Sequence, residues 1–258
     1  MPADPLRPPL EGLVVIDLTR ALAGPYGTML LGDLGAEILK IEPPGAVDST
    51  RGLPPMLGPG VSSYFTSVNR NKKGLSLDLK TSRGLEILRG LAAGADVVID
   101  NFRPGTLARL GIDYEEMRAS LNPRLVSCSI SGFGEEGPYS QRSSFDLVVQ
   151  AMSGAMSVTG EPGGRPVRLG LPVGDLAAGM FADLGILAAL QARGVTGAGR
   201  HVEISMLDCM VALTSYMGAH YLQTGEVPGP QGSGHQVNVP YQAFETSDGY
   251  VVVATASE

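Results

Sequence analysis

Short apolar runs of strand length alternate with helix-like segments along most of this 258-residue chain. In chain order the runs cover residues 14–18, 36–41, 74–79, 96–100, 125–130 and 201–205. The segments between them have helical spacing, as in residues 82–93, where leucines recur every third position. Strands that alternate with helices favour a parallel sheet covered on both sides. We therefore predict an α/β fold with an open, mostly parallel, Rossmann-like sheet and helices on both faces.

The loops that follow the predicted strands are where a site is expected. In open α/β sheets, ligands bind beyond the carboxyl ends of the strands. The loops after Leu18, Ile41, Asp100 and Ile130 occupy that position. The first strand is not followed by a G-x-G-x-x-G segment, and the chain has no Walker sequence. Dinucleotide and nucleoside-triphosphate binding therefore lose their main sequence support.

The Gly- and Pro-rich stretch 224–240 indicates a linker. It is followed by a β-rich run over 250–255, which no later strand can pair. We predict a large domain over residues 1–223, followed over 224–258 by the linker and the beginning of a smaller α+β domain. On this interpretation the chain is the N-terminal portion of a longer protein.

Three long segments carry further expectations. Residues 45–70 lack periodicity and are expected to form a loop with a functional role. Residues 207–221 have the pattern of one helix. The apolar stretch 176–192 contains Asp183 and follows Asp175, so we predict a helix buried in protein and not a membrane span.

Charge and composition exclude several classes of protein. The formal net charge is −7, which does not suit binding of a nucleic-acid backbone, and aromatic residues are 5% of the chain with no Trp. Two cysteines cannot build a disulfide framework, and the three histidines lack metal-site spacing. The N-terminal residues 1–12 contain no apolar segment, so no signal peptide is indicated. These features predict a cytoplasmic protein without a metal.

Nine short motifs are spread in a fixed order over nearly the whole chain. They are PLEGLVVID (9–17), AGP (23–25), LGAEILKIE (34–42), NRNKK (69–73), NFRPG (101–105), SGFG (131–134), GD (174–175), GAG (197–199) and PYQAF (240–244). In this order they resemble the class III CoA-transferases of the CaiB/BaiF family. That family includes formyl-CoA and carnitine CoA-transferases and the α-methylacyl-CoA racemases. The resemblance implies a longer chain with a second domain, acting as an interlocked homodimer.

Asp175 is the candidate catalytic residue. It follows Gly174 and precedes a helical segment, so we expect it at or near the helix N-cap, where the helix dipole favours a carboxylate. Position alone fits an ordinary capping aspartate equally well. The resemblance implies instead that Asp175 is the nucleophile, since the family's nucleophilic aspartate lies in this Gly-Asp context. A carboxylate with an ordinary pKa is ionised at neutral pH without an activating base.

The chemistry implied by the resemblance passes through an aspartyl anhydride and an aspartyl-CoA thioester. The small residues around Asp175, namely Gly170, Gly174, Ala177, Ala178 and Gly179, are expected to let a thioester approach closely. Water must be excluded, because it would hydrolyse the anhydride.

Phe145 separates the two main activities of the family. The racemases carry a His before an Asp in the segment that matches residues 144–147, and this chain has Phe145 before Asp146. Phe cannot move a proton, so a CoA-transferase is favoured over an acyl-CoA racemase. A CoA-binding remnant without catalytic activity remains the other alternative.

The resemblance also implies which residues bind the coenzyme A of the acyl-CoA co-substrate. They are Leu77, Lys80, Asn101, Phe102, Arg109 and Arg142, the three cationic ones for the phosphates. Pro43 and Pro44 stand where the family has a basic residue, so the resemblance does not extend to a contact with adenine there. Leu22 replaces a glutamine of formyl-CoA transferases, and this replacement argues against formyl or oxalate specificity. The Gly-rich lid of formyl-CoA transferases is not present in the same form, and residues 232–235 are candidates for its place. His235 fits a loop residue or a substrate contact equally well. We predict transfer of CoA from an acyl-CoA to a small carboxylic acid, with donor and acceptor undetermined.

Overall fold

The computed structural model describes residues 7–45 and 47–255. Six strands form one sheet in the order β5-β2-β1-β6-β7-β8, and every neighbouring pair is parallel. These strands are β1 (Val14–Asp17), β2 (Glu37–Glu42), β5 (Lys72–Ser76), β6 (Val97–Asp100), β7 (Val126–Ser131) and β8 (His201–Ser205). The predicted α/β class with an open parallel sheet is confirmed.

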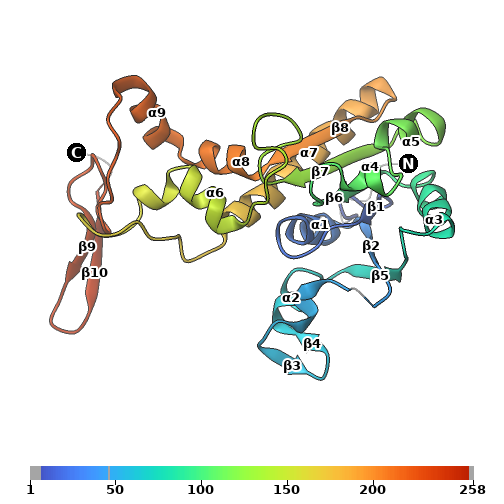
Figure 1. Cartoon of the computed structure of the whole chain (residues 1–258). Helices are drawn as coiled ribbons and strands as arrows, with labels where there is room; N and C mark the ends of the chain where they lie inside the picture. Colours follow the sequence, from blue (N-terminus) through green and yellow to red (C-terminus); the bar gives the residue numbers. More distant parts are fainter. Residues whose placement is uncertain (1–6, 46, 256–258) are drawn as a thin grey trace.

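Helices cover both faces of this sheet (Figure 1). One apolar cluster packs α1 (Ala23–Asp33), α6 (Asp146–Met152), α7 (Val173–Thr196) and α8 (Met206–Leu213) against one face. The other cluster packs α3 (Ser82–Ala92), α4 (Thr106–Arg109) and α5 (Tyr114–Ser120) against the opposite face. Within β1, Val15 belongs to the first cluster and Ile16 to the second. Consecutive strand residues point to opposite faces, so a strand between two helical layers is mostly apolar on both sides.

The strand order reverses between β1 and β6. From β1 the chain moves outward to β2 and β5, and then returns through α3 to place β6 on the other side of β1. This is the doubly wound order, in which the loops after the two central strands diverge and leave a crevice. The loops after β1 and β6 are therefore the expected walls of a site.

Helix α7 is, by length and composition, apolar enough to cross a membrane. It instead packs against α1, β7 and β8, with Ala177, Ala178 and Ala182 fully buried. Gly179 makes this contact close: a Cβ there would lie 2.6 Å from the Ala23 carbonyl oxygen. The prediction of a helix that packs in the protein interior is confirmed, although Leu184 on its outer side is exposed.

Two sequence expectations are wrong in detail. The supposed loop 45–70 contains the hairpin β3 (Met56–Gly58) and β4 (Val61–Ser62), the short helix α2 (Ser63–Ser67) and a 3₁₀ turn (Ser49–Gly52). The single helix expected over 207–221 is divided into α8 and α9 (Ser215–Thr224). Ser215 has a φ of 49°, and a left-handed residue cannot continue a right-handed helix.

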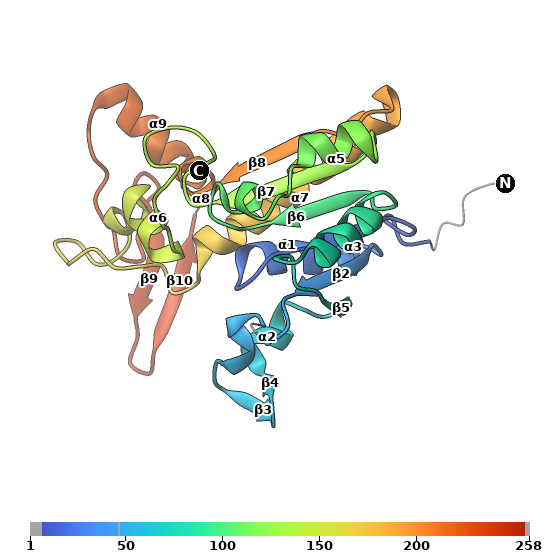
Figure 2. The same ribbon diagram turned by 45° about the vertical axis from the view of Figure 1, so that its right-hand side comes forward.

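The β-rich run near the end is paired, contrary to the expectation that it lacks a partner. β10 (Tyr250–Ala254) forms an antiparallel hairpin with β9 (Tyr241–Glu245). Both views show this hairpin apart from the six-stranded sheet (Figures 1 and 2). The proposed boundary near residue 224 falls at the end of α9 and remains a prediction. The expectation for the first residues falls partly on 1–6, outside the described residues.

Candidate active site

A cavity of about 220 Å³ lies at the carboxyl ends of the central strands. Its wall contains Ala21 from the loop after β1, Asn101 and Phe102 from the loop after β6, Arg142 ahead of α6, and Asp175 in α7. The structure thus brings four of the seven predicted site residues to one cavity at the reversal of strand order. Their roles stay predictions, while their convergence follows from the topology.

The start of α7 sets the position of Asp175, which lies near the N-cap, as expected, in the first turn of the helix. The helix begins at Val173 after Pro172, so Asp175 is its third residue. The free amides of this end are taken by Asp146 of α6. Its Oδ1 accepts from Gly174 N at 2.8 Å and from Asp175 N at 3.4 Å. A capping carboxylate from another helix therefore leaves the Asp175 side chain free to face the cavity.

A hydrogen bond from Gln150 and the close packing at Gly174 hold Asp146 in this position. Gln150 donates from Nε2 to Asp146 Oδ2 at 2.7 Å, and Gln150 itself is fully buried. A Cβ on Gly174 would lie 2.7 Å from Val149 Cγ2 and 3.0 Å from Asp146 Oδ1. Gly174 is thus required where α7 and α6 approach each other, which gives a packing reason for the Gly-Asp pair.

The pKa of Asp175 is not ordinary, contrary to the expectation from sequence. Burial, together with the charge of the neighbouring Asp146 carboxylate, raises this pKa from 3.8 to about 7. Both effects disfavour a second negative charge in a poorly solvated place. Near neutral pH the Asp175 carboxyl group is therefore divided between its protonated and ionised forms.

The small residues near Asp175 serve helix packing, which corrects the role expected for them. Gly174 faces α6, and Gly179 faces α1. Ala177 and Ala178 are fully buried in the core. None of these four lines the cavity, while Gly170 has open space around it. The small side chains bring three helices close together and do not form a path for a thioester.

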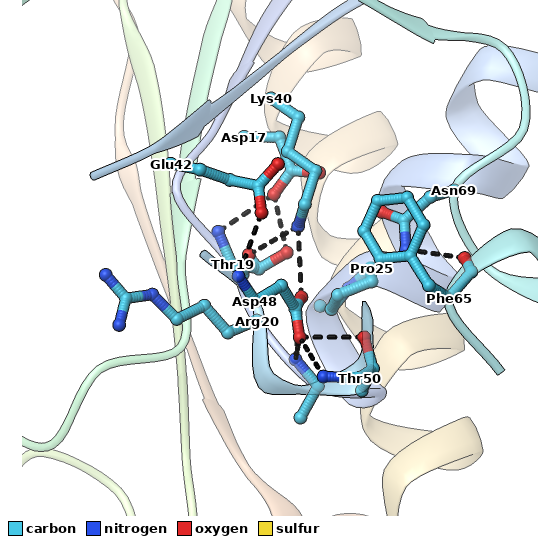
Figure 3. A network of polar contacts seen from close by, with 12 residues as sticks. Asp17, Thr19, Arg20, Pro25, Lys40, Glu42, Asp48, Thr50, Phe65 and Asn69 are labelled. Carbon is cyan, nitrogen blue, oxygen red and sulfur yellow. Dashed lines mark hydrogen bonds and ion pairs between the residues drawn. The ribbon is translucent and has the colours of Figure 1, made fainter. Parts of the chain in front are cut away.

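Buried polar contacts hold the loop after β1 against the cavity (Figure 3). Lys40 donates from Nζ to the Thr19 carbonyl oxygen at 2.8 Å and lies 3.4 Å from Asp48 Oδ2. The Asp48 carboxylate accepts from the backbone N–H of Ala21, at 3.2 Å for Oδ2. Ala21 has a φ of 64°, a strained value for a residue with a Cβ. The buried Lys40 and Asp48 pair therefore stabilises an unfavourable backbone conformation in the cavity wall.

Asn101 joins the two loops that flank the reversal of strand order. Its Oδ1 accepts from Arg20 N at 2.9 Å, and its Nδ2 donates to the Arg20 carbonyl oxygen at 2.7 Å. The Arg20 guanidinium also lies 5.6 Å from the centre of the Phe102 ring. Both hydrogen-bonding ends of the Asn101 amide are thus occupied by the protein, so Asn101 acts here by positioning the loop after β1.

The remaining predicted CoA residues do not line this cavity. Leu77 is buried in the same apolar cluster that contacts Phe102. Lys80 is exposed beside the start of α3, and Arg109 is exposed with Nη2 bonded to Thr106 Oγ1 at 2.9 Å. Arg142, within the cavity wall, stacks on the Tyr139 ring at 4.2 Å. Among the described residues, none of the three cationic side chains forms an ion pair with a carboxylate, so each is free to meet an anion.

Sequence reasoning missed Asp146 and Tyr64 as neighbours of Asp175. Tyr64 lies in α2, and burial followed by the carboxylates of Asp175, Asp48 and Asp146 raises its pKa. No periodic signal marks α2, because it is a short helix in a segment rich in Gly and Pro. Asp146 lies 29 positions before Asp175 in the chain, so no local pattern marks the two as neighbours. Phe145 lines the cavity and is 73% exposed.

His235 lies outside the cavity and organises its own loop. Its Nδ1 accepts from the backbone N–H groups of Val237 and Asn238, both at 3.1 Å. Its ring also stacks on Tyr216 at 6.0 Å. These contacts favour the loop interpretation of His235. In the described part of the chain, no group of three or more His, Cys, Asp or Glu side chains is arranged to hold a metal ion.

The model of CoA-transferase family III matches residues 10–258. Succinyl-CoA:glutarate CoA-transferase of Homo sapiens is 45% identical over 250 residues, covering 96% of this chain and 57% of that protein. Acetyl-CoA:oxalate CoA-transferase of Acetobacter aceti is 43% identical over 258 residues, covering 100% of this chain and 66% of that protein. The chain therefore spans less than two thirds of the length of these relatives.

A solved structure shows the same fold. A CaiB/BaiF family protein from Brucella suis superposes with a TM-score of 0.89 and 40% sequence identity, over 95% of this chain and 66% of that one. The resemblance of the ordered motifs to this family is confirmed.

Proposed function

Because the chain belongs to CoA-transferase family III, we propose that it carries the catalytic aspartate of an enzyme that moves CoA from an acyl-CoA to a small carboxylic acid. The observation that carries the proposal is Asp175, half-buried in a cavity at the reversal of strand order. Relatives named for glutarate, oxalate and mesaconate support a dicarboxylic acid as substrate. Coenzyme A enters as part of the co-substrate and leaves in the product.

The reaction begins with the ionised form of Asp175. One carboxylate oxygen attacks the thioester carbonyl carbon, the carbon–sulfur bond breaks, and CoA leaves as the thiolate. The thiolate then attacks the Asp175 carbonyl carbon of the mixed anhydride. The anhydride carbon–oxygen bond breaks, which releases the donor acid as its carboxylate and leaves an aspartyl-CoA thioester.

The second half reaction repeats these steps with the acceptor acid. Its carboxylate attacks the aspartyl thioester and again displaces the CoA thiolate. That thiolate attacks the acyl carbon of the acceptor, which produces the new acyl-CoA and restores the Asp175 carboxylate. Each intermediate is an activated acyl compound, so the energy of the thioester is kept as long as water is excluded.

Charge at the cavity supports anionic substrates. Arg103 and Arg142 both line the wall, and neither forms an ion pair among the described residues. Guanidinium groups bind carboxylates and phosphates through two parallel hydrogen bonds. We propose that Arg142, with Lys80 and Arg109 outside the cavity, meets the phosphates of CoA. Leu77, Asn101 and Phe102 would form the wall along which CoA lies.

The test is covalent trapping of the acylated carboxylate. The protein is incubated with a panel of acyl-CoA thioesters, treated with hydroxylamine or borohydride, and digested for peptide mass mapping. We expect modification at Asp175 and its loss in Asp175→Ala. Asp183→Asn is the matched control, because Asp183 is buried two turns further along α7 and outside the cavity. Modification at another residue, with Asp175 unmodified, would contradict the proposal.

The two alternatives give different results in companion measurements. An acyl-CoA racemase would exchange the α-proton of its substrate for deuterium in D₂O, which Phe145 beside Asp146 does not support. A CoA-binding remnant would bind the thioester without any trapping. Exchange, or binding alone, would decide against CoA transfer.

Assembly and location are proposed on separate grounds. The free and buried Cys128 and Cys209 fit a reducing cytoplasm. Exposed apolar side chains on α7, α8 and α9, including Leu184, Val211 and Leu222, fit a homodimer that covers them. Sedimentation of the protein at several concentrations tests the assembly, and a monomer at all of them would contradict it.

A further inference from the structure

Strand β7 presents three serine hydroxyls on one face of the sheet. Ser127, Ser129 and Ser131 alternate with Cys128 and Ile130, which belong to the core under α7. The period of two in a strand places the three serines on the opposite side, toward the layer of α4 and α5. They share one backbone environment, so their hydroxyl groups can be compared directly.

Two of these hydroxyls are satisfied by the protein. Ser127 Oγ lies 2.9 Å from His201 Nδ1, and Ser129 donates to Asp100 Oδ2 at 2.9 Å. Ser131 is 9% exposed, and its Oγ has no hydrogen-bond partner among the described residues. A buried hydroxyl without a partner costs free energy, so such groups in folded proteins usually meet a ligand or water. Ser131 is the member of the series placed at the candidate active site.

The side chain of Ser131 lies where two cavities adjoin. It lines the cavity that contains Asp175 and also a larger one of about 730 Å³ under α4 and α5. Phe102, Arg103 and Pro104 form the remainder of the shared wall. The other serines of the Asp175 cavity differ from it: Ser143 is exposed and Ser144 only half-buried. Ser131 is therefore the buried donor of this cavity.

We infer that the Ser131 hydroxyl donates a hydrogen bond to an oxygen of the acyl group that reacts with Asp175. This inference rests on the proposed function. In CoA transfer the carboxylate of the acid becomes the carbonyl of its thioester, so a single donor can serve the same oxygen in both directions. A neutral hydroxyl suits this task, because it binds either a carbonyl or a carboxylate oxygen without adding charge beside Asp175.

Kinetics and stability together test this role. Ser131→Ala is expected to lower kcat/KM by about 10- to 100-fold for both the acyl-CoA and the acid, as for the loss of a hydrogen bond to a charged or polarised oxygen. Its melting temperature should stay at that of the parent protein, because the removed hydroxyl has no hydrogen-bond partner in the part of the chain that the structure describes. Ser131→Thr keeps a hydroxyl and is expected to restore most of the rate.

Ser127→Ala is the matched control on the same strand face. Its hydroxyl contacts His201 and does not line the Asp175 cavity, so this variant should lose stability and keep its kinetics. A Ser131→Ala enzyme with rates within about twofold of the parent, while Asp175 is still trapped, overturns the inference and leaves the proposed function intact. A fall in melting temperature equal to that of Ser127→Ala also overturns it, by showing a structural role. Failure to trap Asp175 in the parent overturns both.

Discussion

Asp17, which is fully buried, and Asp175, which is half-buried, are carboxyl groups at the same end of the sheet, and their pKa values move in opposite directions. Burial opposes ionisation of Asp17, but the charges of Lys72 and Lys40 and the hydroxyls of Thr19 and Thr28 outweigh it and lower the pKa. At Asp175, burial and the charge of Asp146 together raise the pKa to about 7. The neighbours of a carboxyl group, more than its depth, decide whether it is a stable anion or a group that titrates near neutrality.

This difference separates a structural acid from a reactive one. Asp17 accepts hydrogen bonds and pairs with Lys72 Nζ at 3.1 Å, which ties β1 to β5. Asp175 pairs with no cation among the described residues, and it faces a cavity. Asp183 is a third case: it is buried, its Oδ1 has no partner among the described residues, and burial raises its pKa to about 8.

The largest expected effect comes from removing the cation of Asp17. Lys72→Met leaves a buried carboxylate without its partner, and the free energy of unfolding should fall by about 3–5 kcal/mol. Urea unfolding at neutral pH measures this loss. Lys73→Met is the control, because Lys73 pairs with Glu37 on the exposed surface and should cost less than about 1 kcal/mol. Equal losses in the two variants would mean that Lys72 does not neutralise Asp17.

A smaller effect is expected at Asp183, whose Oδ1 has no hydrogen-bond partner among the described residues. Because the folded pKa of Asp183 is raised from 3.8 to about 8, its ionisation opposes folding, and stability falls as the pH rises from about 4 to about 8. Asp183→Asn removes this dependence and should be more stable than the parent by about 1–3 kcal/mol above pH 8, converging with it near pH 4. Thermal unfolding across this range measures the difference. A constant difference at every pH would contradict the assignment.

The smallest expected effect is a shift in the pKa of Asp175 when the charge of its neighbour Asp146 is removed. Asp146→Asn keeps an oxygen that can accept from Gly174 N but removes the negative charge, so the pKa of Asp175 should fall. In the parent, acylation of Asp175 should increase as the pH rises through about 7, because the carboxylate is the nucleophile. The midpoint of this profile should move to lower pH in Asp146→Asn. Asp208→Asn, an exposed acid in α8, should leave the midpoint in place; a shift there would implicate net charge and not Asp146.

Much of the fold could be predicted from the sequence, because its signals are local. The runs around Val15, Ile38 and Val98 are apolar and short, and such runs between two helical layers become buried parallel strands. The split between α8 and α9 could not be predicted, because it depends on the backbone conformation of Ser215 and the helical pattern continues through it. Helix α2 could not be predicted for a different reason, since five residues are too few to show a helical period.

The α/β architecture, the family and the Gly174-Asp175 pair follow from the order and spacing of residues near one another in the chain. That Asp146 caps α7, that Asp175 titrates near neutral pH and that Ser131 has no hydrogen-bond partner among the described residues follow from the three-dimensional arrangement. Those properties depend on solvation and on charges brought together from distant segments. Electrostatic energy follows distance in space, and no local pattern records that distance.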